Sequence, residues 1–127
     1  MLNVNAAYLA VFAICFAGTV HAEGDAAAGE KVFRKCKACH MVGDDAKNRV
    51  GPVLTGIIDE PIASNPDFKY SEVFLEKKDE GYVWTVEELD LYLEKPRDHI
   101  KGNKMAFVGL KKPEDRADVI AYLATFE

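Results

Sequence analysis

The sequence predicts an all-α domain, and three observations support this. Apolar residues recur at the three- and four-residue spacing of a helix face in several segments. No segment shows the strict apolar and polar alternation that is typical of a half-buried strand, and no repeat or low-complexity tract is present. Gly, Pro and Asn-Pro breaks separate the periodic segments into short helices. The 127 residues are enough for one domain.

Residues 1–22 are predicted to be an export signal. Nearly every residue from Ala6 to Val20 is apolar, and Val20-His21-Ala22 supplies a small-residue cleavage site. Cleavage after Ala22 leaves residues 23–127 as the mature domain. An uncleaved membrane anchor is the alternative, since no Lys or Arg precedes the apolar run. The run is nevertheless shorter than the roughly 20 residues that span a bilayer.

The first helix of the mature domain is expected from Ala26 to Cys39, with Asp25 as its N-cap. Its apolar positions follow the i, i+3, i+4, i+7 pattern, at Gly29, Val32, Phe33 and Cys36. Gly51, Pro52 and Gly56 then predict a loop.

Two further helices are indicated by their starts and stops. Ser71 is expected to begin a short helix that Gly81 ends. Thr85 and Glu88 have the spacing of a capping box ahead of an apolar run, and Pro96 is expected to end that helix.

The last helix is expected to begin at Pro113, because proline suits the first helical position and the acidic residues after it suit the helix dipole. One apolar stripe on this helix is interpreted as core: Val119, Tyr122, Leu123 and Phe126.

The segment Cys36-Lys37-Ala38-Cys39-His40 has the C-x-x-C-H pattern of covalent haem attachment. Two thiols one turn apart can each bond to a vinyl group on one haem edge, and the adjoining His40 can then bind the iron. A thioredoxin-like redox pair would need the motif between a strand and a helix. A zinc site would need a second pair of ligands, and the mature domain offers only His99 besides His40. The sequence therefore predicts one covalently bound haem c, held at Cys36 and Cys39.

The sixth iron ligand is predicted by inventory to be Met105. Met41 adjoins His40 and is tied to the same face of the haem, and His99 lies among charged residues that favour a solvated position. Met105 lies in a glycine-containing loop between two helical segments, which suits a ligand delivered from the opposite side. Ordinary core packing is the alternative for an isolated methionine.

Taken together, these motifs resemble the class I cytochrome c family over most of the mature chain. Beyond the attachment motif, the run from Arg49 to Gly56 resembles the family segment after the haem site. The resemblance implies that the carbonyl of Pro52 orients His40 by accepting from its second ring nitrogen. The run from Leu89 to Met105 resembles the family's methionine-ligand segment.

The resemblance implies the class I cytochrome c fold, in which several short helices surround one haem. It places Tyr92 beside the iron-bound sulfur and puts Tyr70 and Trp84 at a haem propionate. The terminal helices would cross at Gly29, Phe33 and Tyr122. The chain departs from the family where Lys101 and Asn103 replace the usual Pro and Thr, and no arginine matches the one that often neutralises the propionates.

A histidine and a methionine would fill both axial positions, so we expect a one-electron carrier and not an enzyme. By resemblance, it would shuttle electrons in the periplasm between a quinol-oxidising complex and an oxidase, reductase or reaction centre, as a monomer without stable membrane insertion. An enzymatic or gas-binding haem protein with a loosely held sixth ligand is one alternative. A fixed subunit anchored by an uncleaved amino terminus is another.

The charge pattern predicts partners with acidic docking surfaces, although the chain has a net charge of −5. Residues 31–49 carry six Lys and Arg against two Asp, giving +4, and residues 95–112 carry six against one, giving +5. Residues 59–90 carry ten acids against three Lys, giving −7. The positive segments contain the predicted haem ligands, so the field would turn that side toward acidic partners. Nucleic acid is an unsuitable partner for an acidic chain without a phosphate-binding run.

Overall fold

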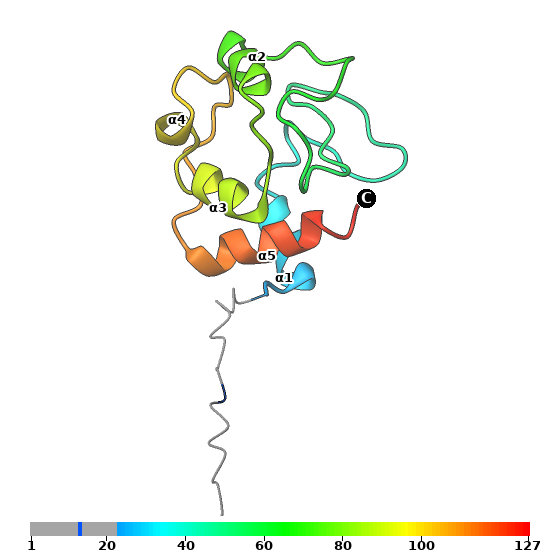
Figure 1. Cartoon of the computed structure of the whole chain (residues 1–127). Helices are drawn as coiled ribbons and strands as arrows, with labels where there is room; N and C mark the ends of the chain where they lie inside the picture. The colour runs from blue at the N-terminus through cyan, green and yellow to red at the C-terminus, as the bar shows by residue number, and fades with distance from the viewer. Residues whose placement is uncertain (1–12, 14–22) are drawn as a thin grey trace, which may run out of the picture.

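The structure is a computed structural model that describes Ala13 and residues 23–127 (Figure 1). The helices of this part are α1 (Ala26–Phe33), α2 (Glu72–Asp79), α3 (Val86–Glu94), α4 (Pro96–His99) and α5 (Pro113–Leu123). Among the described residues, the only pairing of extended backbone is an isolated antiparallel bridge between Pro61 and Val83. The all-α prediction is therefore confirmed. The predicted export signal at residues 1–22 lies, Ala13 apart, outside the described residues.

The terminal helices α1 and α5 cross in contact with each other, as the resemblance implied (Figure 1). At the crossing, a Cβ atom added to Gly29 would lie 1.9 Å from the carbonyl oxygen of Asp118, so only glycine permits this approach. The rings of Phe33 and Tyr122 meet beside it, with centroids 5.4 Å apart. The Asp25 N–H also donates to Asp118 Oδ1 at 2.7 Å, which ties the start of α1 to α5.

Helix α1 begins as predicted but ends earlier than the sequence suggested. Asp25 accepts from the N–H groups of Ala27 and Ala28, which confirms the N-cap. The α-helix stops at Phe33, and residues 34–39 continue as turns with bonds such as Cys36 N–H to Phe33 O at 2.8 Å. Such i to i+3 bonds tighten the backbone beyond the α-helix. The C-x-x-C-H motif therefore lies in turns that follow α1, and the predicted helix to Cys39 was wrong at its end.

The starts of α2 and α3 follow the sequence signals. Ser71 Oγ accepts from Phe74 N–H, and Thr85 Oγ1 accepts from Glu88 N–H at 3.1 Å. The capping box is only half formed, because the Glu88 carboxylate accepts from the Tyr82 hydroxyl at 2.7 Å. Thr85 N–H donates instead to a backbone carbonyl.

Pro96 both ends α3 and begins α4, since proline suits the first position of a helix as well as stopping one. The four-residue helix α4 was not predicted. It packs on α3, and His99 Nε2 lies 2.9 Å from Glu88 Oε2. His99 is exposed, as predicted, but the sequence did not indicate that its ring nitrogen has a carboxylate partner.

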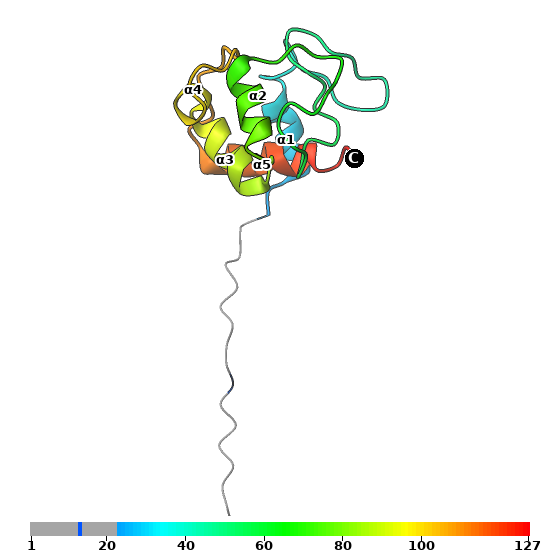
Figure 2. The same cartoon turned by 45° about the horizontal axis from the view of Figure 1, so that its top comes forward.

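The core lies where α3 and α5 meet the loops. α5 begins at Pro113 as predicted, and the buried Arg116 binds Asp90 on α3 at 2.8 Å. Loops of residues 40–70 lie on the side away from α3 and α4 (Figures 1 and 2). The buried apolar residues form one cluster: Phe33, Ile62, Trp84, Leu89, Tyr92, Ile100, Leu110, Val119, Ile120 and Leu123. None of the helices in the described part has the length and apolar character needed to cross a membrane.

Candidate functional site

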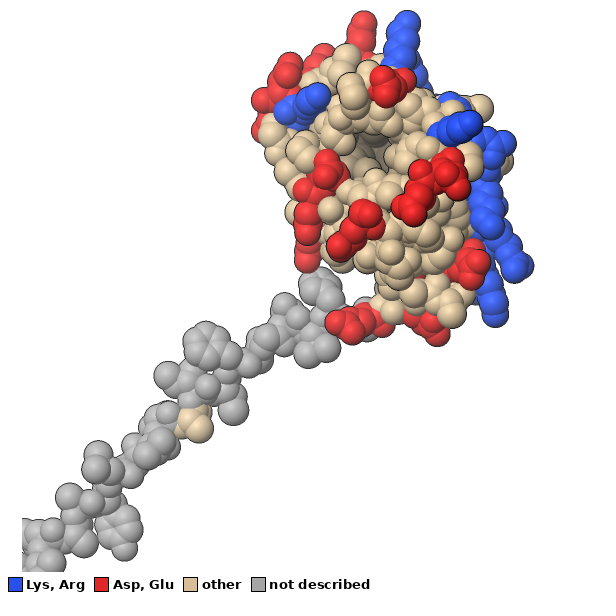
Figure 3. Space-filling model, turned by 90° about the vertical axis from the view of Figure 1, so that its right-hand side faces the viewer, with Lys and Arg blue, Asp and Glu red and all other residues tan. Residues whose placement is uncertain are grey.

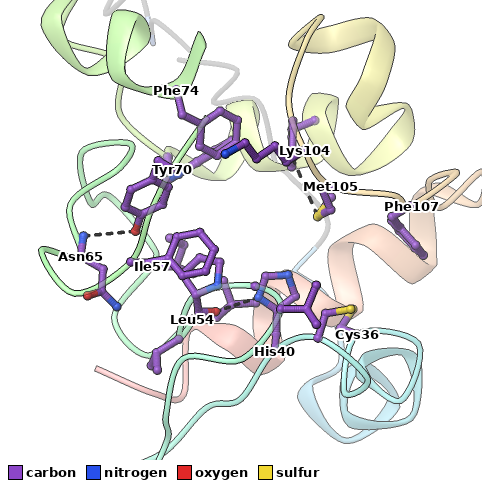
Figure 4. A pocket seen from close by; sticks show the side chains of 18 of the residues that line it. Cys36, His40, Leu54, Ile57, Asn65, Tyr70, Phe74, Lys104, Met105 and Phe107 are labelled. Carbon is purple, nitrogen blue, oxygen red and sulfur yellow. Dashed lines mark hydrogen bonds between the residues drawn. The ribbon is translucent and has the colours of Figure 1, made fainter. Parts of the chain in front are cut away.

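A cavity of about 770 Å³ lies between the helices and the loops (Figure 4). Its size is within the range of about 300–1,000 Å³ that is usual for cofactor sites. Its walls are mainly apolar and include side chains from the C-x-x-C-H motif, the loop after it, α3, α5 and the loop after α4. Two thiols, an imidazole and a thioether line it as well: Cys36, Cys39, His40 and Met105. This combination of a large apolar space with covalent and axial ligand groups fits a haem.

His40 forms one wall, and its ring orientation is fixed by the loop behind it. Its Nδ1 lies 2.8 Å from the carbonyl oxygen of Pro52, so Nδ1 carries the proton that is donated and Nε2 is left free. Burial lowers the pKa of His40 and the Pro52 hydrogen bond partly opposes this, so the neutral imidazole that binds metals is favoured. A Cβ atom at position 51 would lie 2.3 Å from His40 Cε1, so the ring packs directly on the backbone of Gly51.

The two motif cysteines are partly buried, and the structure contains no disulfide between them. Burial raises the pKa of the Cys36 thiol, and Lys35 opposes this only in part. A disulfide-exchange cysteine would instead have a lowered pKa. The described residues hold no cluster of three His, Cys, Asp or Glu side chains suited to a metal ion. The raised pKa of the Cys36 thiol disfavours the thioredoxin-like interpretation.

Met105 reaches the cavity from the loop after α4, and His40 enters it from a different segment (Figure 4). The single proton of the Tyr92 hydroxyl has two acceptors in reach, Met105 Sδ at 3.9 Å and Asn103 Oδ1 at 3.4 Å, and can be donated to one of them at a time. Burial raises the pKa of Tyr92, which keeps its hydroxyl a proton donor. His99 is not among the cavity-lining residues. Met105 is therefore the better candidate for a ligand opposite His40.

Tyr70 and Trp84 both line the cavity. The Tyr70 hydroxyl accepts from the N–H of Asn65 at 3.2 Å, so its own proton is free to donate to an acceptor in the cavity (Figure 4). Burial raises the pKa of Tyr70, which keeps that proton in place. The rings of Trp84 and Tyr92 pack with centroids 4.9 Å apart.

The cavity also uses residues that the sequence did not single out. Asn65 Nδ2 donates to Asn48 Oδ1 at 2.8 Å, and this bond joins the loop before Tyr70 to the loop that follows the C-x-x-C-H motif. No arginine is among the described residues that line the cavity. The Lys and Glu side chains that line it are Lys35, Glu60, Lys69 and Lys104. Asparagines in loops have many roles, so the role of Asn48 and Asn65 at this site becomes visible only from their contact in three dimensions. The sequence showed Gly51 as part of a Gly-Pro pair after the motif. It did not show that the backbone of Gly51 contacts the His40 ring.

Comparisons with known proteins show the family to which the chain belongs. Residues 26–127 match the family model described as cytochrome c. The chain is 47% identical to cytochrome c2 of Rhodomicrobium vannielii over 113 residues, which cover 89% of this chain and 88% of the relative. The solved structure of cytochrome c2 from Rhodospirillum centenum matches with a TM-score of 0.75 and 44% identity, covering 81% of this chain and 98% of the other. Cytochrome cH from Methylobacterium extorquens matches with a TM-score of 0.72 and 39% identity, covering 80% and 99%. The chain therefore belongs to the cytochrome c family, as an electron-transfer protein with one covalently bound haem c.

Proposed function

We propose that this protein holds its haem through Cys36 and Cys39, with His40 and Met105 as axial ligands, and shuttles single electrons between membrane redox complexes in the periplasm. The observation that carries this proposal is the meeting of an imidazole and a thioether in one apolar cavity. Each group has an independent partner, the Pro52 carbonyl for His40 and the Tyr92 hydroxyl for Met105.

The haem supplies one-electron chemistry when bound, and the residues around it set its conditions. A thioether ligand in an apolar pocket raises the reduction potential. If His40 and Met105 both bound the iron, they would leave it no free position for a substrate. The support that Met105 receives from Tyr92 disfavours the alternative of a gas-binding protein with a loose sixth ligand.

The proposed docking side is the positive one. Residues 31–49 and 95–112 supply most of the cations and also the two axial ligands. On the face shown in Figure 3, most of the visible Lys and Arg gather along one edge, and Asp and Glu are spread around a hollow. Each positive segment also has a strongly exposed apolar residue close to it, Val50 at 80% and Val108 at 92%. Charge steers a fast encounter, and a small apolar contact suits a transient complex with an acidic partner.

The test of ligation compares two methionine variants, Met105→Leu and Met41→Leu. Leucine conserves the side-chain volume, so packing changes little. We expect the ferric wild type to show the red absorption band of sulfur-to-iron charge transfer. Met105→Leu should lose this band and have a lower midpoint potential in a redox titration. Met41→Leu should keep both, because Met41 does not line the cavity. A wild type without the band would overturn the proposal.

Export and attachment are tested by fractionation and intact mass. The proposal expects a species in the periplasmic fraction that begins at Glu23 and carries the mass of one haem. A full-length chain recovered with membranes would instead support the anchored subunit. Haem that is extracted by acidified acetone would contradict attachment at Cys36 and Cys39.

A further inference from the structure

Asn103 lies two residues before Met105, and groups that can form hydrogen bonds face every donor and acceptor position of its side chain. Its Nδ2 donates to the carbonyl oxygens of Pro96 at 2.9 Å and Ile100 at 2.7 Å. Its Oδ1 accepts from the Met105 N–H at 2.9 Å and faces the Tyr92 hydroxyl at 3.4 Å. We infer that Asn103 is the positioning residue that holds Met105 in place, by joining the methionine loop to α4 and to Tyr92. This inference rests on the proposed role of Met105 as a ligand.

The orientation of the amide follows from its neighbours. Both donor positions face carbonyl oxygens, and both acceptor positions face an N–H or O–H group. A flipped amide would set its oxygen against two carbonyls and its nitrogen against the Met105 N–H. The network therefore assigns the two ends of the side chain without ambiguity.

The methionine loop has little other support from its own backbone. Between Lys104 and Gly109, no backbone group forms a hydrogen bond with another backbone group of the described residues. The Asn103 N–H reaches the Ile100 carbonyl only at 3.4 Å, and the next backbone bond along the chain is from Leu110 to Leu93. The Asn103 side chain is thus the partner of the Met105 N–H. Such a side-chain bond to the N–H two residues on fixes the local turn.

The base to which Asn103 is anchored is well packed. Pro96 is fully buried, and Ile100, which follows α4, is only 2% exposed. α4 is also joined to α3 through the contact of His99 with Glu88. The Asn103 amide therefore fixes the methionine loop, which lacks regular structure, relative to the buried residues of α4 and its end.

The variants Asn103→Val and Asn103→Thr separate the two halves of this role. Threonine and valine have nearly the same shape, but the threonine hydroxyl can still accept from the Met105 N–H. Neither supplies both donors to α4. Lys101→Ala is the matched control, because Lys101 is exposed in the same loop. Each ferric holoprotein is titrated with imidazole, which must displace Met105 to bind the iron.

We expect Asn103→Val to bind imidazole about tenfold more tightly than the wild type, the factor expected for the loss of one such hydrogen bond. Asn103→Thr should lie between Asn103→Val and the wild type, and Lys101→Ala should match the wild type. The charge-transfer band should weaken in the same order. In denaturant, the band of Asn103→Val should disappear before the helical signal, because the loop is released first.

Three results would overturn the inference. Wild-type imidazole affinity in Asn103→Val, with only a lower unfolding midpoint, would show a general structural role. If Asn103→Val fails to fold, wild-type affinity in Asn103→Thr would count against the inference in the same way, and tighter binding would support it. A wild type without the charge-transfer band would overturn the ligand role of Met105 and this inference together, whereas a normal wild type with unchanged variants would overturn this inference alone.

Discussion

The two walls of the haem cavity are built in different ways. On the histidine wall, His40 directly follows Cys39 in the chain, and it packs on the backbone of Gly51 and bonds to the Pro52 carbonyl. On the methionine wall, Met105 lies in a loop whose support comes from the side chains of Asn103 and Tyr92. The first wall thus depends on neighbouring residues and backbone contacts, and the second depends on side chains that folding brings together.

This difference indicates where the site is easiest to change. In the proposed site, His40 is joined by a peptide bond to Cys39, the proposed attachment residue, so substitutions around His40 should lower stability and leave ligation in place. The methionine ligand has no such tether. Substitutions around it should therefore alter iron ligation, whether or not they also lower stability.

The largest effect is expected for Gly109→Ala on the methionine wall. Gly109 has φ of +108°, and its Cβ would lie 2.0 Å from the carbonyl oxygen of Glu94 at the end of α3. The backbone must move, at a cost of about 2–4 kcal/mol from the strained φ and the overpacking together. The methionine loop should shift away from α3, so ferric imidazole affinity should rise and the melting temperature should fall.

Gly43→Ala is the control for this change. Gly43 has a similar φ of +104°, but an added Cβ would meet no atom within 4 Å. It should therefore lose only the conformational part of the stability, about 1–2 kcal/mol, and bind imidazole like the wild type. Equal imidazole affinities in Gly109→Ala and Gly43→Ala would contradict the contrast between the two walls.

A smaller effect, mainly on stability, is expected for Gly51→Ala on the histidine wall. The added Cβ would lie 2.3 Å from His40 Cε1, and overpacking of this kind costs about 1–3 kcal/mol. The ring can tilt while it stays next to the attachment site. We expect a lower guanidinium midpoint with the charge-transfer band retained. Loss of the band at wild-type stability would show that the histidine wall is the weaker one.

The sequence predicted the parts of the fold that local chemistry determines. Asp25, Ser71 and Thr85 cap their helices as expected because each cap needs only a hydroxyl or carboxylate and the next turn. Pro113 begins α5 for the same local reason. α4 was missed because four residues are too few to show a period. The end of α1 was placed too late because turns with i to i+3 bonds share the apolar spacing of a helix.

Within the site, the same division holds. The C-x-x-C-H motif and the Gly-Pro pair are contiguous, so their chemistry could be interpreted from spacing alone. Asn103 stood out in the sequence only as a departure from the usual threonine, since its partners at Pro96 and Ile100 become visible only in three dimensions. The pairing of His99 with Glu88, eleven residues apart, was missed for the same reason.

The smallest effect is expected for Glu88→Gln, which lies one step further from Met105. The Tyr82 hydroxyl and then His99 lower the pKa of Glu88 by hydrogen bonds to its carboxylate. A carboxylate with a lowered pKa stabilises the fold at neutral pH, and this contribution is lost as the pH falls through its folded pKa. Because the side chain is 37% exposed, the loss at neutral pH should be at most about 1 kcal/mol. Urea unfolding should show a difference in unfolding free energy from the wild type that shrinks toward acid pH.

The imidazole affinity of Glu88→Gln should stay within about twofold of the wild type, because α4 is also held by the buried Pro96 and Ile100. A larger change in affinity would mean that the contact between Glu88 and His99, and not the packing of α4, supports the methionine wall.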